Sequence, residues 1–159
     1  MNSKVIFGVE KELALNDFLV DKLSNKLGLL ELNGYRLVEK KVKNIDGIDV
    51  TVNVLSVQCV SLNTNKQVKV DLAYDGTNKS DLDVALAELK KNPFQKQFID
   101  FEDVIVGHYI GGSGNFAMIT QTYKANKVIR VDQKSAERIF RGDQPIQPTP
   151  QPNQQPNKG

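Results

Sequence analysis

The stretch from Val50 to Leu62, VTVNVLSVQCVSL, limits most strongly what this chain can fold into. It is long and rich in β-branched residues, which favour a strand over a helix. The apolar side chains share one face of such a strand up to Val54 and the opposite face from Leu55 onward. This change of face midway predicts a bulge or a strong bend, which a strand needs in order to curve within a small barrel.

Further strands are expected on both sides of this stretch. Asp46-Gly47 is typical of a hairpin turn, and "NTNK" at 63–66 turns the chain a second time. The glycine-rich segment "GGSGN" at 111–115 would be the hairpin connection between the last two strands. The other strands are predicted at 35–43, 68–72, 98–110 and 116–124, with 125–131 extending the last one after an irregularity.

Two longer helices and one short helical turn are also expected. Leucines at spacings of three, four and seven predict a helix over 9–27, which a glycine would end. A second helix, capped by Asn78 or Ser80, would end at Lys91 shortly before a proline. Residues 135–140 are predicted to form a final helical turn.

The expected elements follow one another as helix, three strands, helix and two strands. This is the order of the OB-fold, a five-stranded Greek-key barrel that fits a helix between its third and fourth strands. An open five-stranded sheet with one helix packed on it would have the same order and remains an alternative. The sequence therefore predicts a mainly β protein with helices (α+β). Its parts would be an N-terminal helical extension at 1–33, an OB-like barrel at 34–141 and a disordered Pro/Gln-rich tail at 142–159.

The composition limits the chemistry that the chain can perform. It has a net charge of +2, one cysteine and one histidine, which excludes an intramolecular disulfide and is too little for a typical zinc site. A Cys59–His108 pair is the remaining arrangement for nucleophilic catalysis, but both residues lie within strand patterns rather than at loop tips. We therefore expect no catalytic residues, no metal and no cofactor, in a cytoplasmic protein without a membrane span.

The glycine-rich segment is also a candidate for phosphate binding. A Walker-type loop needs a lysine and then a serine or threonine after its last glycine, followed by a helix. Here Gly114 is followed by Asn115, Phe116 and an alternating strand. The segment therefore predicts a hairpin, and no small-molecule substrate is expected.

Basic and aromatic residues gather on the predicted strands. Proteins that bind single-stranded nucleic acid combine cations for the backbone with aromatic faces on which bases stack. The candidates for phosphate contact are Lys40, Lys41, Lys43, Lys66, Lys69, Lys124 and Lys127. The candidates for stacking are Tyr35, Tyr74, Tyr109, Phe116 and Tyr123. The alternative is that the lysines are solvated strand edges and that some of the aromatic residues belong to the core.

The element order, the size and the polar tail resemble the single-stranded-DNA-binding proteins of the OB class, above all the divergent versions of phages and Gram-positive conjugative plasmids. The resemblance covers about residues 34–131 and rests on architecture. It implies DNA lying across the second and third strands, flanked by the hairpins at 44–48 and 111–115. It also implies a non-enzymatic homo-oligomer that coats single-stranded DNA, or RNA, in replication, recombination or conjugative transfer.

The chain departs from that family in its ends and its aromatic residues. The usual bacterial members end in an acidic, hydrophobic tip, whereas this chain has no acid after Asp143. It also lacks tryptophan and has the expected helical extension before the barrel. The alternative function is a protein-binding adaptor or a structural assembly component of a phage or plasmid.

Overall fold

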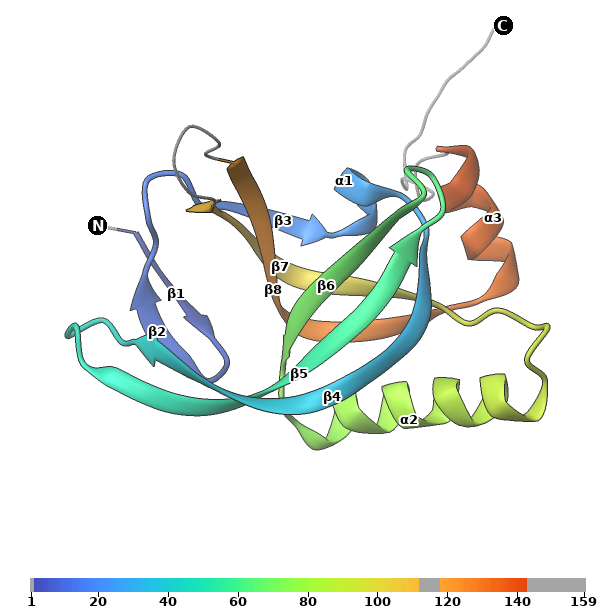
Figure 1. The fold of residues 1–159 in the computed structure, drawn as a ribbon, viewed down its shortest axis with the longest axis horizontal. Coiled ribbons are helices and arrows are strands. Elements are labelled where there is room, and N and C mark those ends of the chain that lie inside the picture. Colours follow the sequence, from blue (N-terminus) through green and yellow to red (C-terminus); the bar gives the residue numbers. More distant parts are fainter. Residues whose placement is uncertain (1, 112–117, 143–159) are drawn as a thin grey trace, which may run out of the picture.

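The computed structural model describes residues 2–111 and 118–142, which are mainly β-strand (Figure 1). The first elements are β1 (Ser3–Ile6), β2 (Val9–Glu12), β3 (Phe18–Lys22) and α1 (Ser24–Leu27). They are followed by β4 (Leu30–Lys43), β5 (Asp49–Ser61), β6 (Lys66–Ala73) and α2 (Gly76–Lys91). The last described elements are β7 (Phe98–Gly111), β8 (Met118–Val131) and α3 (Gln133–Arg141). The expected mainly β class with a few helices is confirmed.

Five strands form a closed ring of backbone hydrogen bonds. β4 pairs antiparallel with β5, β5 with β6, and β8 with β7. β6 and β8 are parallel and meet through two residue pairs, Asp71–Lys124 and Leu72–Ala125. β7 returns to β4 through Leu30–Ile99 and Glu31–Phe98, and β3 continues along the same edge of β7. We call these five strands (β4, β5, β6, β8 and β7) the ring.

The main hydrophobic core fills the inside of the ring. Every ring strand contributes to it, for example through Leu32, Val57, Val70, Phe101 and Val128. Helix α2 adds two fully buried side chains to this core, and Figure 1 shows that α2 lies across one end of the ring. The side of a ring strand that bears these residues is its inner face, and the alternate residues lie on its outer face.

Asn78 joins α2 to the place where the ring closes. Its side chain is 1% exposed and donates hydrogen bonds to the carbonyl oxygens of Ala73 and Asn126. Its side-chain oxygen accepts a hydrogen bond from the amide of Val128. The N-cap of α2 is Asp75, which accepts from the amide of Asn78, so the predicted cap at Asn78 or Ser80 is wrong.

The predicted helix over 9–27 is wrong, because this segment forms β2, β3 and the four-residue α1. Phe7 and Gly8 have positive φ angles of 57° and 77°, and this turn folds β1 back on β2 as a hairpin. β3 pairs with β7, a partner far away in the sequence. The leucine spacing does not mark one buried face, because Leu19 is 56% exposed. Tertiary strand pairing therefore overrides the helical periodicity.

The change of face in β5 marks a change in what each face contacts. Leu55 and Val57 face the main core, whereas Val54 packs in a second cluster with Ile6 of the β1–β2 hairpin and Ile105. β5 keeps an unbroken register with β4 on this stretch. The register shift lies in β4, between Leu32 and Gly34, so the bulge, one of the two expected alternatives, is wrong for β5. The other alternative, a strong bend, agrees with the curved course of β5 in Figure 1, and residues 54–57 are buried on both faces.

The remaining predicted elements are observed where the structure describes them. The strands expected at 35–43, 50–62 and 68–72 are β4, β5 and β6, and the turn at 135–140 is part of α3. Residues 112–117 and 143–159 lie outside the described residues, so most of the hairpin predicted at 111–115 and of the tail predicted at 142–159 is not described. No helix within the described residues is long and apolar enough to span a membrane.

We predict that Leu82→Ala destabilises the protein by about 2–5 kcal/mol, because Leu82 is fully buried between α2 and the ring. Val84 lies on the same helix but is 44% exposed, so Val84→Ala should change the free energy of unfolding by about 0.5 kcal/mol or less. Urea unfolding followed by circular dichroism measures both. Equal effects of the two substitutions would contradict the placement of α2.

Candidate nucleic-acid interface

Tyr35, a predicted stacking residue, has a structural role. Its ring packs against the main core, and its hydroxyl donates a hydrogen bond to Asp83 of α2. This hydrogen bond, helped by burial, raises the pKa of Tyr35 above its usual value. Asp83 also forms an ion pair with Lys79, one turn away on α2. Tyr35 therefore links β4 to α2.

The other predicted aromatic residues occupy different surroundings. Tyr74 follows β6 and is 44% exposed, and Tyr109 on β7 is 54% exposed. Tyr123 of β8 is half-buried, packs against the main core and has a pKa raised by that burial. Phe116 lies outside the described residues. Among the described residues, Tyr74 and Tyr109 are therefore exposed, whereas Tyr123 is partly in the core.

Three of the seven predicted lysines form ion pairs with neighbouring carboxylates. The pairs are Lys40–Asp71, Lys43–Asp49 and Lys127–Glu102. In the described part of the chain, Lys41, Lys66 and Lys69 are exposed and have no carboxylate within 4 Å. These three cations are the ones whose charge is most available to an external anion.

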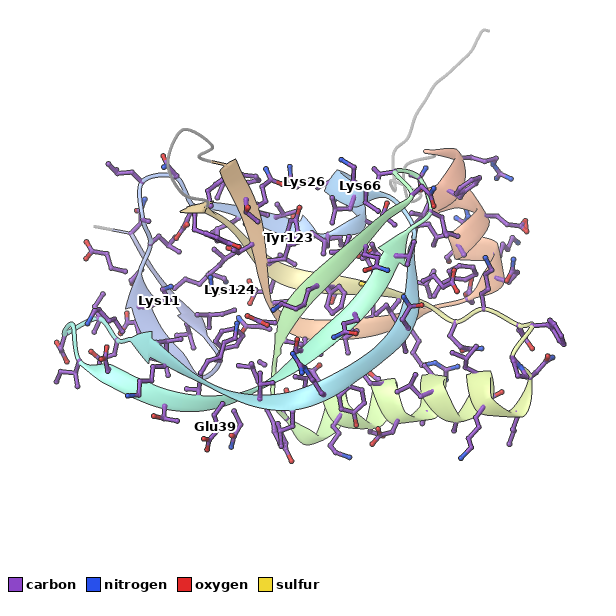
Figure 2. All side chains as sticks on the ribbon, in the orientation of Figure 1. Lys11, Lys26, Glu39, Lys66, Tyr123 and Lys124 are labelled. Carbon is purple, nitrogen blue, oxygen red and sulfur yellow. The ribbon has the colours of Figure 1, made fainter. Side chains whose placement is uncertain are left out.

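Lys124 lies in a region of mixed charge on the outer face of the ring. Burial lowers its pKa, and the neighbouring charges of Lys11 and Lys40 lower it further, whereas Asp17 and Asp71 raise it. Figure 2 shows Lys124 next to Lys11, beside the β1–β2 hairpin. Lys124 is half-buried among charges of both signs, so its charge is less available to a phosphate than that of an exposed lysine.

A connected set of side chains, not predicted from the sequence as a unit, extends from α1 to β8. The ammonium group of Lys26 lies 5.5 Å from the centroid of the Phe18 ring, and that ring lies 6.1 Å from the His108 ring. Nε2 of His108 lies 3.3 Å from Nε2 of Gln121, and the hydroxyl of Tyr123 donates to Oε1 of Gln121 at 2.9 Å. We call these five residues the Phe18 cluster.

Strand pairing brings the Phe18 cluster together. Val106 of β7 is paired with Phe18 on one side and with Tyr123 on the other. The three residues therefore stand side by side on the inner face, since directly paired residues of neighbouring strands point to the same side. His108 and its partner Gln121 follow two residues further along the same strands, again on that side.

β8 is not paired with β6 around the Phe18 cluster. The two strands are paired only at Asp71–Lys124 and Leu72–Ala125, and on the N-terminal side of these pairs they diverge (Figure 1). Phe18 is 41% exposed, and Gln121 is exposed as well. Nδ1 of His108 is buried and has no hydrogen-bond partner within the described residues. The cluster thus has a partly exposed aromatic ring and a cation in one place.

Sequence analysis missed Phe18 and Lys26 because it assigned both to a helix. The signal that was present is the run Phe18-Leu19-Val20, whose residue types are typical of a strand. His108 was interpreted as a half-buried strand residue, which agrees with its position in β7. Only the pairing of β3 with β7 reveals that Phe18 and His108 share a face.

The Cys59–His108 pair considered for catalysis is not formed. Cys59 is 1% exposed within the main core, and its thiol contacts the carbonyl oxygen of Val68 at 3.6 Å. His108 contacts Phe18 and Gln121 instead. Among the described residues no group of three or more His, Cys, Asp or Glu side chains is arranged to hold a metal ion.

The chain was compared with known proteins at three levels. No family model matches it, and neither a curated protein nor a solved structure matches it.

We predict that Cys59 resists alkylation in the folded protein. Burial raises the pKa of its thiol from 9.0 to about 12, so at pH 8 its thiolate fraction falls about a thousandfold. The raised pKa also means that stability is retained below pH 9 and decreases as the pH rises from 9 towards 12. Mass spectrometry after iodoacetamide treatment, with and without urea, measures how much of Cys59 is alkylated. Fast labelling without urea would contradict a buried thiol.

Proposed function

We propose that this protein binds single-stranded DNA, with single-stranded RNA as the alternative, on an OB-type barrel. The closed ring of five strands, with α2 between the third and fourth of them, supports this proposal, because it has the strand number and helix position of that fold. An OB barrel binds extended strands through exposed aromatic and cationic side chains. The protein would coat the nucleic acid without altering it chemically.

The Phe18 cluster is the observation that carries the proposal. The partly exposed ring of Phe18 on the inner face gives a base a surface on which to stack. Such stacking does not depend on the base sequence of the nucleic acid, because every base has an aromatic face. Lys26 above the same ring is positioned to contact the phosphate that follows the stacked base. Gln121 and Tyr123 add hydrogen-bonding groups beside it.

An exposed lysine on β6 extends this surface. Lys66 begins β6, on the far side of the divergence between β6 and β8, and Figure 2 shows it near Lys26 with Tyr123 below both. Lys66 is exposed and alternates with the core residues Val68 and Val70, so it lies on the same inner face as the Phe18 cluster. We propose that the nucleic acid passes from the Phe18 cluster towards β6, with Lys26 and Lys66 neutralising its phosphates.

A second function, protein binding by self-association, is favoured by the N-terminal segment. β3 is an edge strand that pairs with β7 alone among the described strands. Leu15 is fully exposed just before this edge, and Leu19 on it is 56% exposed. Unpaired strand edges with apolar side chains pair readily with other chains. Size-exclusion chromatography with and without oligonucleotide separates this function from the first, since an adaptor would form oligomers regardless of DNA.

We predict that Phe18→Ala weakens binding to fluorescent oligo-dT by about tenfold, because one stacked base contributes roughly 1–3 kcal/mol. Phe94 is the matched control, since it is 95% exposed on the α2–β7 connection and has no partner in the Phe18 cluster. Phe94→Ala should therefore leave the affinity unchanged. Fluorescence anisotropy at low salt measures both variants. If the unaltered protein shows no binding at micromolar concentration, the proposed function is wrong.

We predict a steep salt dependence to which Lys66 contributes. Each phosphate contact to a single strand adds about 0.7 to the slope of log K against log salt, so Lys66→Ala should reduce that slope by about this amount. Lys90 in the last turn of α2, away from the divergence of β6 and β8, is the control, and Lys90→Ala should not change the slope. Equal slopes for Lys66→Ala and the unaltered protein would mean that Lys66 does not contact a phosphate of the bound DNA.

A further inference from the structure

A cavity of about 440 Å³ opens between α1, the end of β8 and α3. Figure 1 shows α1, the β5–β6 turn and α3 next to one another at this end of the ring. Residues of all three line the cavity, for example Leu27, Asn63 and Ile139. A cavity of this volume is in the range of sites that enclose a small ligand, and it is large enough for one nucleotide.

The charges that line the cavity are mainly positive. Four cations, Lys22, Lys26, Arg130 and Arg138, face two carboxylates, which leaves an excess of two positive charges. Lys22 also forms an ion pair with Glu102, outside the cavity, at 3.8 Å, whereas Arg130 donates to the neutral side chain of Gln97 at 3.3 Å. An anionic ligand is therefore favoured.

Both carboxylates of the cavity are already bound by the protein itself. Asp100 is 2% exposed and accepts hydrogen bonds from the amide and hydroxyl of Ser24 and from the amide of Phe101. Burial raises its pKa, against the hydrogen bonds from Ser24 and Phe101 and the charge of Lys22, which lower it. Asp132 caps α3 by accepting from the amide of Ser135. These oxygens hold α1 and α3 in place, so their hydrogen-bonding capacity is partly used by the protein backbone.

The rest of the lining suits a flat, partly apolar group. Leu27, Ile129, Val131 and Ile139 provide aliphatic surface. The amide side chain of Asn25 and the hydroxyls of Thr64 and Ser135 provide hydrogen-bonding groups. A nucleotide combines the two requirements, because its base packs on aliphatic side chains while its phosphate binds cations.

Lys26 connects this cavity to the Phe18 cluster. Its side chain lines the cavity, and its ammonium group lies over the Phe18 ring. A nucleic-acid strand with one base stacked on Phe18 would therefore have its next nucleotide at the entrance of the cavity. The volume of about 440 Å³ accommodates one nucleotide, which suits the end of a nucleic-acid strand.

We propose that this cavity binds a nucleotide monophosphate unit, with the phosphate between Arg130 and Arg138 and the base against the aliphatic wall. The unit is the phosphorylated terminal nucleotide of a bound strand or a free mononucleotide. The terminal form rests on the proposed function above, because it requires that the protein binds single strands.

The experiment compares three oligo-dT probes of equal length with the full chain: one 5′-phosphorylated, one 3′-phosphorylated and one without terminal phosphate. Fluorescence anisotropy measures the affinities, and isothermal titration with dTMP tests the free mononucleotide. We expect one phosphorylated end to bind about tenfold more tightly than the unphosphorylated probe, because a charge-assisted hydrogen bond adds an effect of this size. Arg138→Ala and Arg130→Ala should each remove that preference.

Two control variants separate the cavity from the rest of the surface. Phe18→Ala should weaken all three probes alike and keep the preference for a terminal phosphate. Lys90→Ala should change neither the affinity nor the preference. Because Arg138 lies on α3, circular dichroism checks that its variant folds, and Arg130→Ala tests the same cavity from β8.

Each outcome decides between the two proposals. Oligonucleotide binding without an end preference and without dTMP binding overturns the cavity proposal and leaves single-strand binding intact. An end preference that survives both arginine substitutions also overturns it. If the protein binds dTMP in a way that depends on Arg138 but binds no oligonucleotide, the cavity is a site for free nucleotides. That result overturns the proposal that the protein binds single-stranded nucleic acid.

Discussion

The short parallel contact between β6 and β8 is the constraint on which the rest of the structure depends. Two residue pairs, Asp71–Lys124 and Leu72–Ala125, close the ring, and Asn78 donates to the backbone of each strand just after them, at Ala73 and Asn126. On the N-terminal side of these pairs β6 and β8 diverge (Figure 1), and the part of β8 that bears Gln121 and Tyr123 lies there unpaired with β6. The same contact therefore closes the core and opens the candidate interface.

The two faces of β8 lie in different surroundings. Tyr123 lies on the inner face and joins the Phe18 cluster, whereas the next residue, Lys124, lies on the outer face among charges of both signs. On the outer face Lys40 is ion-paired with Asp71, and Lys124 is half-buried. Lys26 lies over the Phe18 ring, and Lys66 is exposed at the start of β6.

Local patterns predicted the elements whose partners are near in sequence. The hairpin of β4 and β5, the helix before Asn92 and the pairing of β7 with β8 follow from turn residues, charges and alternation. β3 was missed because its partner β7 lies about 80 residues away, and short-range periodicity carries no information on such a pairing. The roles of Tyr35 and Lys40 were missed for the same reason, since Asp83 and Asp71 come from other elements.

The β1–β2 hairpin determines which face of the ring is left for a ligand. Asn126 of β8 accepts from the amide of Phe7 and donates to the carbonyl of Val5 and to Asp103, and Lys4 forms an ion pair with Asp103. These polar contacts hold the hairpin so that its apolar side chains cover the outer face of the neighbouring ring strands. The resemblance implies a strand across the second and third barrel strands. Because the chain covers part of its own outer face, the accessible aromatic surface is the inner face beyond the β6–β8 contact. Bound nucleic acid would therefore lie closer to β3 and α1 than the resemblance implies. These elements belong to the segment that the sequence pattern predicted as a helix.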